Sequence, residues 1–355
     1  MKQLDAPKII DVARLAGVST ATVSRALSKP ETVAKQTREA VLAAAAETGY
    51  RINLAARNLR RRRTGAVVLL VPNLGNPFFS QILAGIEATL SRKGLSILMV
   101  DTMQSGTRLD FIREYVHPSR ADGVIVLDGS LPQDLLRPGG ENGKQVPVVF
   151  ACEWHPHEDF PSVRADNGQG ARLAIEHLAA LGHEKIGYVN GPEANVLSQF
   201  RLNAAKKALA DLGKTVNEHW FLKGDFTLQS GVLAARKWLD MADRPTALLC
   251  ANDETAIGLI SELHQCGVQV PDELSVVGFD DVDIAQHYIP ALTTVWQPRF
   301  DLGTAVAQML VDGISEGDLN PDTPVMTLPV KLKIRKSTAA PKKVASKTTV
   351  ATTAA

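Results

Sequence analysis

The sequence has few of the residues that build covalent cross-links or metal sites. Its three cysteines, Cys152, Cys250 and Cys266, are widely spaced, and none belongs to a CxxC pair. This number and spacing favour neither a disulfide framework nor a thiolate zinc site, so we expect small core residues. The histidine-rich stretch 155–159 fixes no metal-ligand spacing either. We predict a surface loop there, no metal and no cofactor.

Long hydrophobic runs are also absent. The longest, such as residues 66–71, are far too short to cross a bilayer, and the first ten residues lack the apolar stretch of a secretory signal. We therefore expect a cytoplasmic protein with no membrane partner. Catalytic signatures such as GxSxG, HExxH and the P-loop are missing as well, which argues against an enzyme. Adjacent carboxylates such as Asp280 and Asp281 point apart along a chain and would not share a substrate.

Positive charge is concentrated at the two ends of the chain. Residues 1–63 carry 13 Lys and Arg against 5 Asp and Glu, a net charge of +8. Residues 331–355 carry 7 against none, so the part between the two ends has a net charge of −14. A basic head on an acidic body predicts a polyanion as the partner of the head. The run Arg60 to Arg63 is the densest part of this charge, although a solvated linker would have the same composition.

The basic head has the pattern of three short helices. Apolar residues recur at helical spacing over 9–16 and Gly17 follows, while Ser19 is suited to begin a second helix. An alanine-rich third helix is predicted over 35–48, with Gly49 at its end. Two short helices joined by a tight turn are typical of a helix-turn-helix, although such pairs also occur in proteins that never touch DNA.

The second helix would carry the base contacts if the head binds DNA. Its apolar positions turn inward, which leaves Thr20, Ala21 and Arg25 facing outward. In a helix-turn-helix such residues meet base edges in the major groove, where Arg suits guanine and Thr or Ala suits a thymine methyl group. The predicted DNA-binding residues of this helix are Ser19, Thr20, Ala21, Thr22, Ser24 and Arg25.

From residue 65 onward, apolar runs alternate with amphipathic helical stretches. Strands are predicted over 66–71, 95–101, 123–127, 185–190, 246–251 and 274–279, and helices over 78–93, 168–181, 202–212, 230–241 and 255–265. Strands that are apolar throughout need helices on both faces of a parallel sheet. About ten strands in roughly 270 residues are more than a single sheet usually holds, so two α/β lobes with a cleft between them are predicted. The small, polar and basic segment 337–355 is predicted to be a disordered tail.

Several long motifs, in this order, resemble the LacI/GalR family of bacterial repressors. In the head they are KIIDVARLAGVSTATVSRAL and TREAVLAAAAETGYRINLAARNLRRRRTG. In the body they are VPNLGNPFFSQILAGIE, GHEKIGYVNGPE, PTALLCANDETAIG, VPDELSVVGFDDVDIA and PALTTVWQP. Through STATVSRAL, the GPE segment, GDFT and QPRFDLG, the chain is most similar to the cytidine-responsive repressor branch of this family.

The resemblance implies a definite domain organisation. A helix-turn-helix head would cover 1–50, a hinge helix and linker 51–64, and an effector-binding and dimerisation core 65–336. The core would share the fold of periplasmic sugar-binding proteins, with two Rossmann-like lobes joined by three crossovers. One lobe would hold about 65–163 and 293–323, and the other about 164–292 and 324–336.

The resemblance also assigns DNA-binding residues outside the helix-turn-helix. In the family, the hinge helix folds when two protomers meet over the minor groove of the operator. Residues 53–59 match this hinge, and Leu59 matches the leucine that pries apart a central base step. A linker leucine that packs on the core is the alternative. Asn53, Arg57 and Arg60 would bind DNA with Leu59, the arginines through phosphates.

A small effector would bind in the cleft between the lobes, where polar residues follow the carboxyl ends of strands. The predicted effector-binding residues are Phe78, Phe79, Arg201, Phe226, Asn252, Asp253 and Asp280. Aromatic rings combined with these polar groups would stack a ring-shaped ligand and bind its hydroxyls. Core packing of the two adjacent phenylalanines and a structural ion pair between Arg201 and Asp280 are the alternatives.

The expected function is that of a homodimeric repressor that binds a pseudo-palindromic operator and responds to a metabolite. Asn195 and Leu197 stand where the purine repressor has a base-binding Arg and Thr, so a nucleoside is favoured as effector over a purine base. A pentose or hexose is the second candidate. A small-molecule binding protein without DNA function, or a hydrolase built on the cleft, is the rival from another class. The basic tail would add salt-sensitive affinity for DNA.

Overall fold

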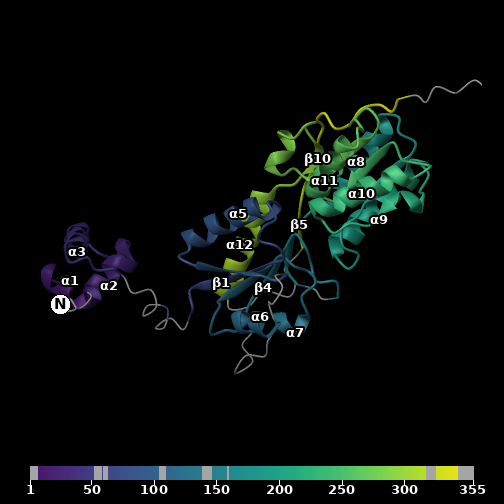
Figure 1. Ribbon diagram of the computed structural model, residues 1–355. Coiled ribbons are helices and arrows are strands. Elements are labelled where there is room, and N and C mark those ends of the chain that lie inside the picture. The colour runs from purple at the N-terminus through teal and green to yellow at the C-terminus, as the bar shows by residue number, and fades with distance from the viewer. Residues whose placement is uncertain are drawn as a thin grey trace, which may run out of the picture. The chain divides into compact units, whose positions relative to one another are not determined.

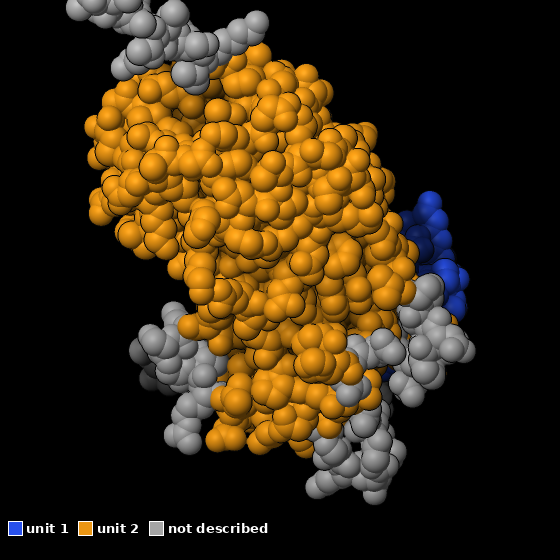
Figure 2. Space-filling model, turned by 90° about the vertical axis from the view of Figure 1, so that its right-hand side faces the viewer, with its two compact units in different colours: residues 1–64 blue, residues 65–355 orange. Residues whose placement is uncertain are grey.

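The structure is a computed structural model, and it describes residues 7–51, 58, 63–103, 109–137, 146–157, 160–316 and 325–342. The chain forms two compact units, residues 1–64 and 65–355 (Figure 1). The second unit, orange in Figure 2, is one continuous body. Within these described ranges, no helix has both the length and the apolar content that crossing a bilayer requires.

Within residues 7–51, the first unit contains the helices α1 (Ile9–Leu15), α2 (Thr20–Ser28) and α3 (Lys35–Thr48), with a short 3-10 helix η1 (Pro30–Thr32) before α3. Gly17 follows α1 and Gly49 follows α3, with φ angles of 65° and 68°. These left-handed conformations end a helix without strain only at glycine. The core of the unit is made of small residues, Val12, Ala13, Val23, Ala26, Val41 and Ala44. The predicted helical head is therefore confirmed.

The second unit contains two six-stranded sheets, one in each lobe. The first sheet has the strand order β11-β5-β4-β3-β1-β2, and all of its pairings are parallel. Its strands are β1 (Ala66–Val71), β2 (Ser96–Asp101), β3 (Gly123–Val126), β4 (Val148–Ala151), β5 (Ser162–Ala165) and β11 (Met326–Leu328). Its helices are α5 (Phe78–Arg92), α6 (Leu109–Val116), α7 (Gln133–Leu136) and α12 (Arg299–Glu316).

The second sheet has the order β12-β10-β9-β8-β6-β7, and only the short β12 is antiparallel to its neighbour. Its strands are β6 (Ile186–Val189), β7 (Phe221–Leu222), β8 (Ala247–Cys250), β9 (Ser275–Asp280), β10 (Thr293–Trp296) and β12 (Lys331–Lys333). Its helices are α8 (Asn167–Ala180), α9 (Val196–Asp211), α10 (Leu228–Asp240) and α11 (Asp253–Gln265). The predicted two-lobed α/β core is confirmed.

Both faces of the first sheet are covered, which is why its strands are apolar throughout. On β1, Val67 and Leu69 belong to the core cluster that includes α5 and α12. Val68 and Leu70 point the other way and join the cluster that includes α6 and α7. The helices α5 and α12 cross closely at Gly85, where a Cβ would lie 2.2 Å from the carbonyl oxygen of Phe300. Glycine at this point lets the two helices approach each other.

The structure corrects the predicted lobe limits at two strands. Residues 293–296 were assigned to the first lobe, but β10 pairs with β9 in the second sheet. Residues 326–328 were assigned to the second lobe, but β11 pairs with β5 in the first sheet. The chain therefore crosses between the lobes after β5, after β10 and again between β11 and β12. The crossings lie a few residues away from the limits that the resemblance implies, because the pairing partner of a short strand decides which sheet it joins.

The structure also corrects the predicted start of the disordered tail at residue 337. Ser337 is fully buried, and its hydroxyl accepts a hydrogen bond from Thr293 N at 2.8 Å and donates one to the Val276 carbonyl at 2.6 Å. Ala339 N donates to Ser275 Oγ at 3.0 Å. Residues 337–342 thus pack along the second lobe, because its strand ends satisfy their backbone and hydroxyl groups. The rest of the predicted tail, 343–355, lies outside the described residues.

Candidate functional site

The helix α2 presents the side chains that the sequence assigns to DNA. The Ser19 hydroxyl accepts a hydrogen bond from Thr22 N at 3.1 Å, and this cap explains why the helix begins there. Thr20, Ala21 and Arg25 are exposed or partly exposed at its surface. Thr22 and Ser24 are partly exposed, and Val23 and Ala26 fix the opposite face in the core. In a helix-turn-helix, one face of the second helix packs in the core while its exposed N-terminal residues meet base edges, and α2 has this arrangement.

The residues that the sequence assigns to the hinge belong to a different part of the first unit, between α3 and β1. Asn53, Arg57, Leu59 and Arg60 lie outside the described residues, so their roles stay predictions. The described part of this segment includes Asn58, whose Nδ2 donates to the Thr64 carbonyl at 2.9 Å.

In the second unit, the predicted effector residues surround one cavity between the lobes. Six of the seven line it: Phe78, Phe79, Arg201, Phe226, Asn252 and Asp280. They come from α5 in the first lobe and from α9, β9 and the segments before α10 and α11 in the second lobe. Four further residues complete the wall, and the predicted set did not include them: Asn76, Cys152, Glu153 and Leu197.

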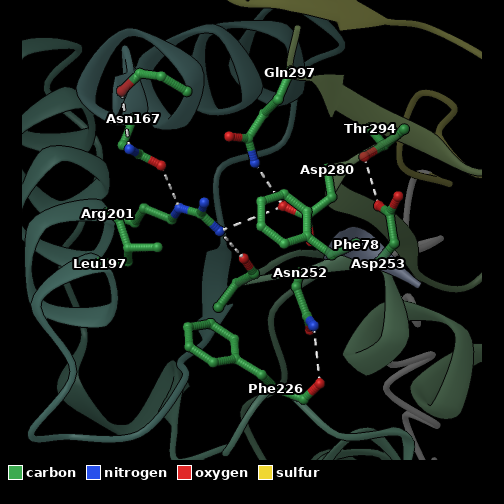
Figure 3. Close-up of polar contacts among 12 residues, drawn as sticks. Phe78, Asn167, Leu197, Arg201, Phe226, Asn252, Asp253, Asp280, Thr294 and Gln297 are labelled. Atoms are coloured by element: carbon green, nitrogen blue, oxygen red, sulfur yellow. Dashed lines mark hydrogen bonds and ion pairs between the residues drawn. The ribbon is translucent and has the colours of Figure 1, made fainter. Parts of the chain in front are cut away.

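Arg201 is at the centre of the polar side of this cavity (Figure 3). Its Nε donates to Asn167 Oδ1 at 2.8 Å and its Nη1 donates to the Ala251 carbonyl at 2.6 Å. The guanidinium lies 3.8 Å from the centroid of the Phe279 ring, an attractive cation–π geometry. The prediction placed Arg201 beside a strand end before a helix that began at residue 202. The structure instead places it within α9, which begins at Val196 because the Asn195 side chain caps it.

Asp280 faces Arg201 across the cavity wall. Its Oδ1 lies 3.8 Å from Arg201 Nη1 and accepts a hydrogen bond from Gln297 Nε2 at 2.7 Å. Burial raises the pKa of Asp280 to about 7, and the attraction of Arg201 and Arg299 offsets only part of this effect. The pair therefore offers a ligand a fixed cation beside a carboxyl group that can accept or donate a hydrogen bond near neutral pH.

Asp253 is a correction to the predicted pocket. It is fully buried at the start of α11 and does not line the cavity. Its Oδ1 accepts from Thr294 Oγ1 at 2.5 Å, and its Oδ2 accepts from Val282 N at 2.9 Å. Both carboxylate oxygens are used inside the lobe, so Asp253 joins α11 to the neighbouring strand β10 and the segment after β9. Adjacent Asn252 does line the cavity, and its Nδ2 donates to the Phe226 carbonyl at 2.8 Å.

Strained backbone is concentrated around the cavity. Among the described residues, the non-glycine residues with positive φ are Cys152 (67°), Phe226 (69°), Asp280 (119°) and Asp281 (53°). The first three line the cavity and the fourth follows one of them in the chain. Such conformations are unfavourable for residues with a Cβ and persist where the surrounding structure holds them, commonly at ligand sites.

Glu153 is the charged residue of the cavity that the prediction missed. Its Oε2 accepts from Gly129 N at 2.7 Å and its Oε1 accepts from Asn195 Nδ2 at 2.7 Å. Burial raises the pKa of Glu153 to about 7, although both hydrogen bonds oppose the shift. Burial also raises the pKa of the neighbouring Cys152 thiol. Both residues directly follow β4, so the rule that ligands bind beyond strand ends could have found them.

Two families of known proteins match this chain. Residues 8–53 match bacterial regulatory proteins of the lacI family, and residues 175–338 match the periplasmic binding protein-like domain. The chain is 37% identical over 331 residues to the HTH-type transcriptional repressor PurR of Photobacterium profundum, covering 93% of this chain and 98% of that protein. It is 36% identical over 311 residues to the HTH-type transcriptional repressor CytR of Escherichia coli K12, covering 88% and 91%.

A solved structure of similar architecture is the lac repressor dimer bound to operator and the anti-inducer ONPF. Its TM-score is 0.80 at 30% sequence identity, and the match covers 95% of this chain and all of that chain (100%). The similarity therefore spans both the helical head and the two-lobed body.

Proposed function

The chain belongs to the LacI family of bacterial regulatory proteins, and from this membership we propose that a metabolite in the cavity between its lobes controls its binding to operator DNA. As a member of this family it is a DNA-binding transcriptional repressor with an effector-binding core, not an enzyme. The single observation that carries the proposal is the cavity itself. Six of the effector contacts that the sequence predicts line it, and three of its lining residues have strained backbone of the kind common at ligand sites.

The proposed DNA contacts are those of α2 and the hinge, acting on a pseudo-palindromic site in the cytoplasm. The outward positions of Thr20, Ala21 and Arg25 support the first set. Selection of duplexes from a random pool by the full chain should enrich a palindromic sequence. Arg25→Ala should then reduce the preference for that sequence over random duplex.

Arg14→Ala is the matched control for this experiment. Arg14 is an exposed arginine of α1, with 78% of its side chain accessible. Its loss should weaken specific and random duplex by a similar factor, as expected for a charge that contacts no base edge. If Arg25→Ala also weakened both duplexes equally, α2 would not read the sequence.

For the effector, we favour a nucleoside. The Phe226 and Phe78 rings provide apolar walls for a flat base, while Arg201, Asp280 and Asn252 offer donors and acceptors for ribose hydroxyls. Identities of 37% to PurR and 36% to CytR do not separate these two branches. Calorimetric titration of the full chain with cytidine, uridine, adenosine and inosine tests the proposal. Saturable binding of at least one nucleoside, and none by Arg201→Met, is the expected result.

A sugar is the second candidate, and the polar side of the cavity favours it. Arg201, Asp280 and Asn252 form a group that binds hydroxyls whether or not a base is attached. Ribose and glucose therefore belong in the same titration. Binding of a free sugar without binding of any nucleoside would select this candidate.

We also propose that the protein acts as a homodimer through apolar surface on both lobes. On the first lobe, the edge strand β2 and its surroundings expose Leu74, Leu98, Met99, Met103 and Phe111. On the second lobe, Ile284 is 51% exposed and Ile289 is 89% exposed. Apolar groups gathered on a sheet edge favour a protein partner, and the related lac repressor structure is a dimer. Sedimentation of Met99→Asp, expected to shift toward monomer, tests this interface.

A further inference from the structure

A polar contact beside the cavity joins Glu153 of the first lobe to Asn195 of the second, and Arg299 of α12 makes a separate contact between the lobes through the Asp281 carbonyl at 2.9 Å. Glu153 follows β4 of the first lobe, and Asn195 precedes α9 of the second lobe. Asn195 Nδ2 donates to Glu153 Oε1 at 2.7 Å, and Glu153 lines the cavity. Hydrogen bonds to an ionised carboxylate are stronger than those between neutral groups, more so where water is excluded.

The fold fixes the direction in which the Asn195 amide points. Its Oδ1 accepts from Leu197 N at 2.9 Å and from Ser198 N at 3.2 Å, which caps α9. Because the oxygen is held by the helix, the Nδ2 group is left to face Glu153. The partner is held in the same way, since Glu153 Oε2 accepts from Gly129 N at 2.7 Å. Neither side chain is free to turn away while its own lobe stays folded.

An aromatic contact lies beside this hydrogen bond. Trp154, the residue after Glu153, meets Phe200 of α9 with ring centroids 5.6 Å apart at an interplanar angle of 90°. This edge-to-face geometry is favourable. Arg164 of β5 lies 4.4 Å from the Trp154 ring centroid and covers it from the side of the first lobe. Two adjacent residues of the first lobe thus contact the second lobe at α9. Glu153 binds Asn195, which caps the helix, and Trp154 contacts Phe200 within it.

The cavity behind these contacts is too small for the effector proposed above. Its volume is about 50 Å³, whereas pockets for small organic ligands measure roughly 300–1,000 Å³. A nucleoside or sugar cannot occupy it until the lobes or their side chains move apart. The contacts between Glu153 and Asn195 and between Trp154 and Phe200 each join one lobe to the other, so they must break if the lobes separate at this side of the cavity.

We propose that these four residues form a clasp that holds the lobes together and must open before the effector enters. Glu153 and Asn195 are positioning residues: they set how often the cavity opens. This inference rests on the proposed function only in placing the effector in the cavity. The clasp itself can be measured without any effector.

Thiol labelling of the full chain with N-ethylmaleimide measures cavity opening. Cys152 lines the cavity and is 3% exposed, Cys250 is buried in β8, and Cys266 is exposed. Mass spectrometry of the peptides gives each rate separately. Cys266 should react first in every variant, Cys152 should report opening of the clasp, and Cys250 should report unfolding of the lobe.

Three variants test the clasp while keeping the cap of α9. Asn195→Ser keeps a capping oxygen but lacks an amide that reaches Glu153. Asn195→Asp keeps the cap but, when labelling is done at about pH 8 and so above the pKa of Glu153, it places two carboxylates together. Each should raise the Cys152 labelling rate about tenfold or more and leave Cys250 unchanged. The third variant combines Glu153→Gln with Asn195→Asp and reverses the contact. The amide introduced at position 153 donates to the carboxylate introduced at position 195, and its oxygen still accepts from Gly129 N. This double variant should return the rate toward that of the unchanged chain.

Three results would overturn the clasp. The first is an unchanged Cys152 rate in both single variants at Asn195. The second is a double variant that labels as fast as Asn195→Asp alone. The third is acceleration of Cys152 and Cys250 by the same factor in all variants, which would mean that the contact only stabilises the fold. Failure of every nucleoside and sugar to bind would instead contradict the proposed function and leave the labelling result standing.

Discussion

Replacing Arg201 with Met removes the cation at the centre of the cavity while keeping a side chain of similar length. The hydrogen bonds to Asn167 and to the Ala251 carbonyl would be lost, and each contributes about 1.5–3 kcal/mol as a bond from a charged group. Burial of the Met side chain returns part of this free energy. Asp280, whose pKa is already about 7, can take up a proton instead of staying charged and unpaired. We expect the free energy of unfolding to fall by about 3 kcal/mol.

Tryptophan fluorescence during urea unfolding of the full chain measures this change. All four tryptophans lie within residues 65–355, so the signal follows the second unit. Arg236→Met is the matched control, because Arg236 is 62% exposed and its 2.7 Å contact with Glu262 is a surface pair, typically worth about 0–1 kcal/mol. Combining Arg201→Met with Asp280→Asn should be less destabilising than the sum of the two changes. If Arg201→Met were no more harmful than Arg236→Met, the proposed network would be refuted.

Three further predictions concern other parts of the molecule. Ser337→Ala leaves the buried Thr293 N and Val276 carbonyl without the hydroxyl as partner and should lower the free energy of unfolding by about 2 kcal/mol. The control Ser315→Ala, at an exposed serine, should change it little. Equal effects of the two changes would contradict the packing of the C-terminal segment on the second lobe. Burial raises the pKa of Glu153 from 4.5 to about 7, so the protonated form of this side chain favours the folded state. Its contribution to the free energy of unfolding is full below the ordinary pKa of 4.5 and is lost as pH rises through 7. Between about pH 6 and pH 8 the free energy of urea unfolding should therefore fall by about 1 kcal/mol relative to Glu153→Gln, and a constant difference would refute the shift. Ser19→Ala removes the cap of α2 and should reduce amide-exchange protection over 8–50 by about fivefold, whereas unchanged protection would deny the cap a role.

The sequence predicts those elements whose limits depend on local chemistry. Gly17 and Gly49 mark helix ends because their left-handed conformations suit glycine, and Ser19 marks a helix start through its cap. Strands such as β1 are recognisable because both of their faces are buried. The cavity residues were predictable for a related reason: parallel strands bring their carboxyl ends to one edge of a sheet.

What the sequence does not predict depends on partners distant in the chain. The polar segment after residue 336 has no apolar periodicity, yet the ends of β9 and β10 satisfy its backbone and hydroxyl groups. Asn252 and Asp253 are adjacent in the sequence, but only Asn252 lines the cavity. The hydrogen bond from Thr294 to Asp253 shows that Asp253 points into the core of the lobe instead. The position of Glu153 after β4 could mark it as a cavity residue, but its hydrogen bond to Asn195 depends on how the two lobes pack. Contacts across lobes of this kind are not encoded in local spacing.

We propose above all that an effector bound in the cavity changes the affinity with which α2 binds DNA. Fluorescence anisotropy of the duplex selected by the full chain, titrated with protein in the presence and absence of each nucleoside and sugar that binds, tests it most directly. At least one such ligand should change the affinity for this duplex several-fold, and the change should vanish in Arg201→Met. The account would be contradicted if every bound ligand left the affinity unaltered, or if the chain bound the selected duplex no better than random DNA.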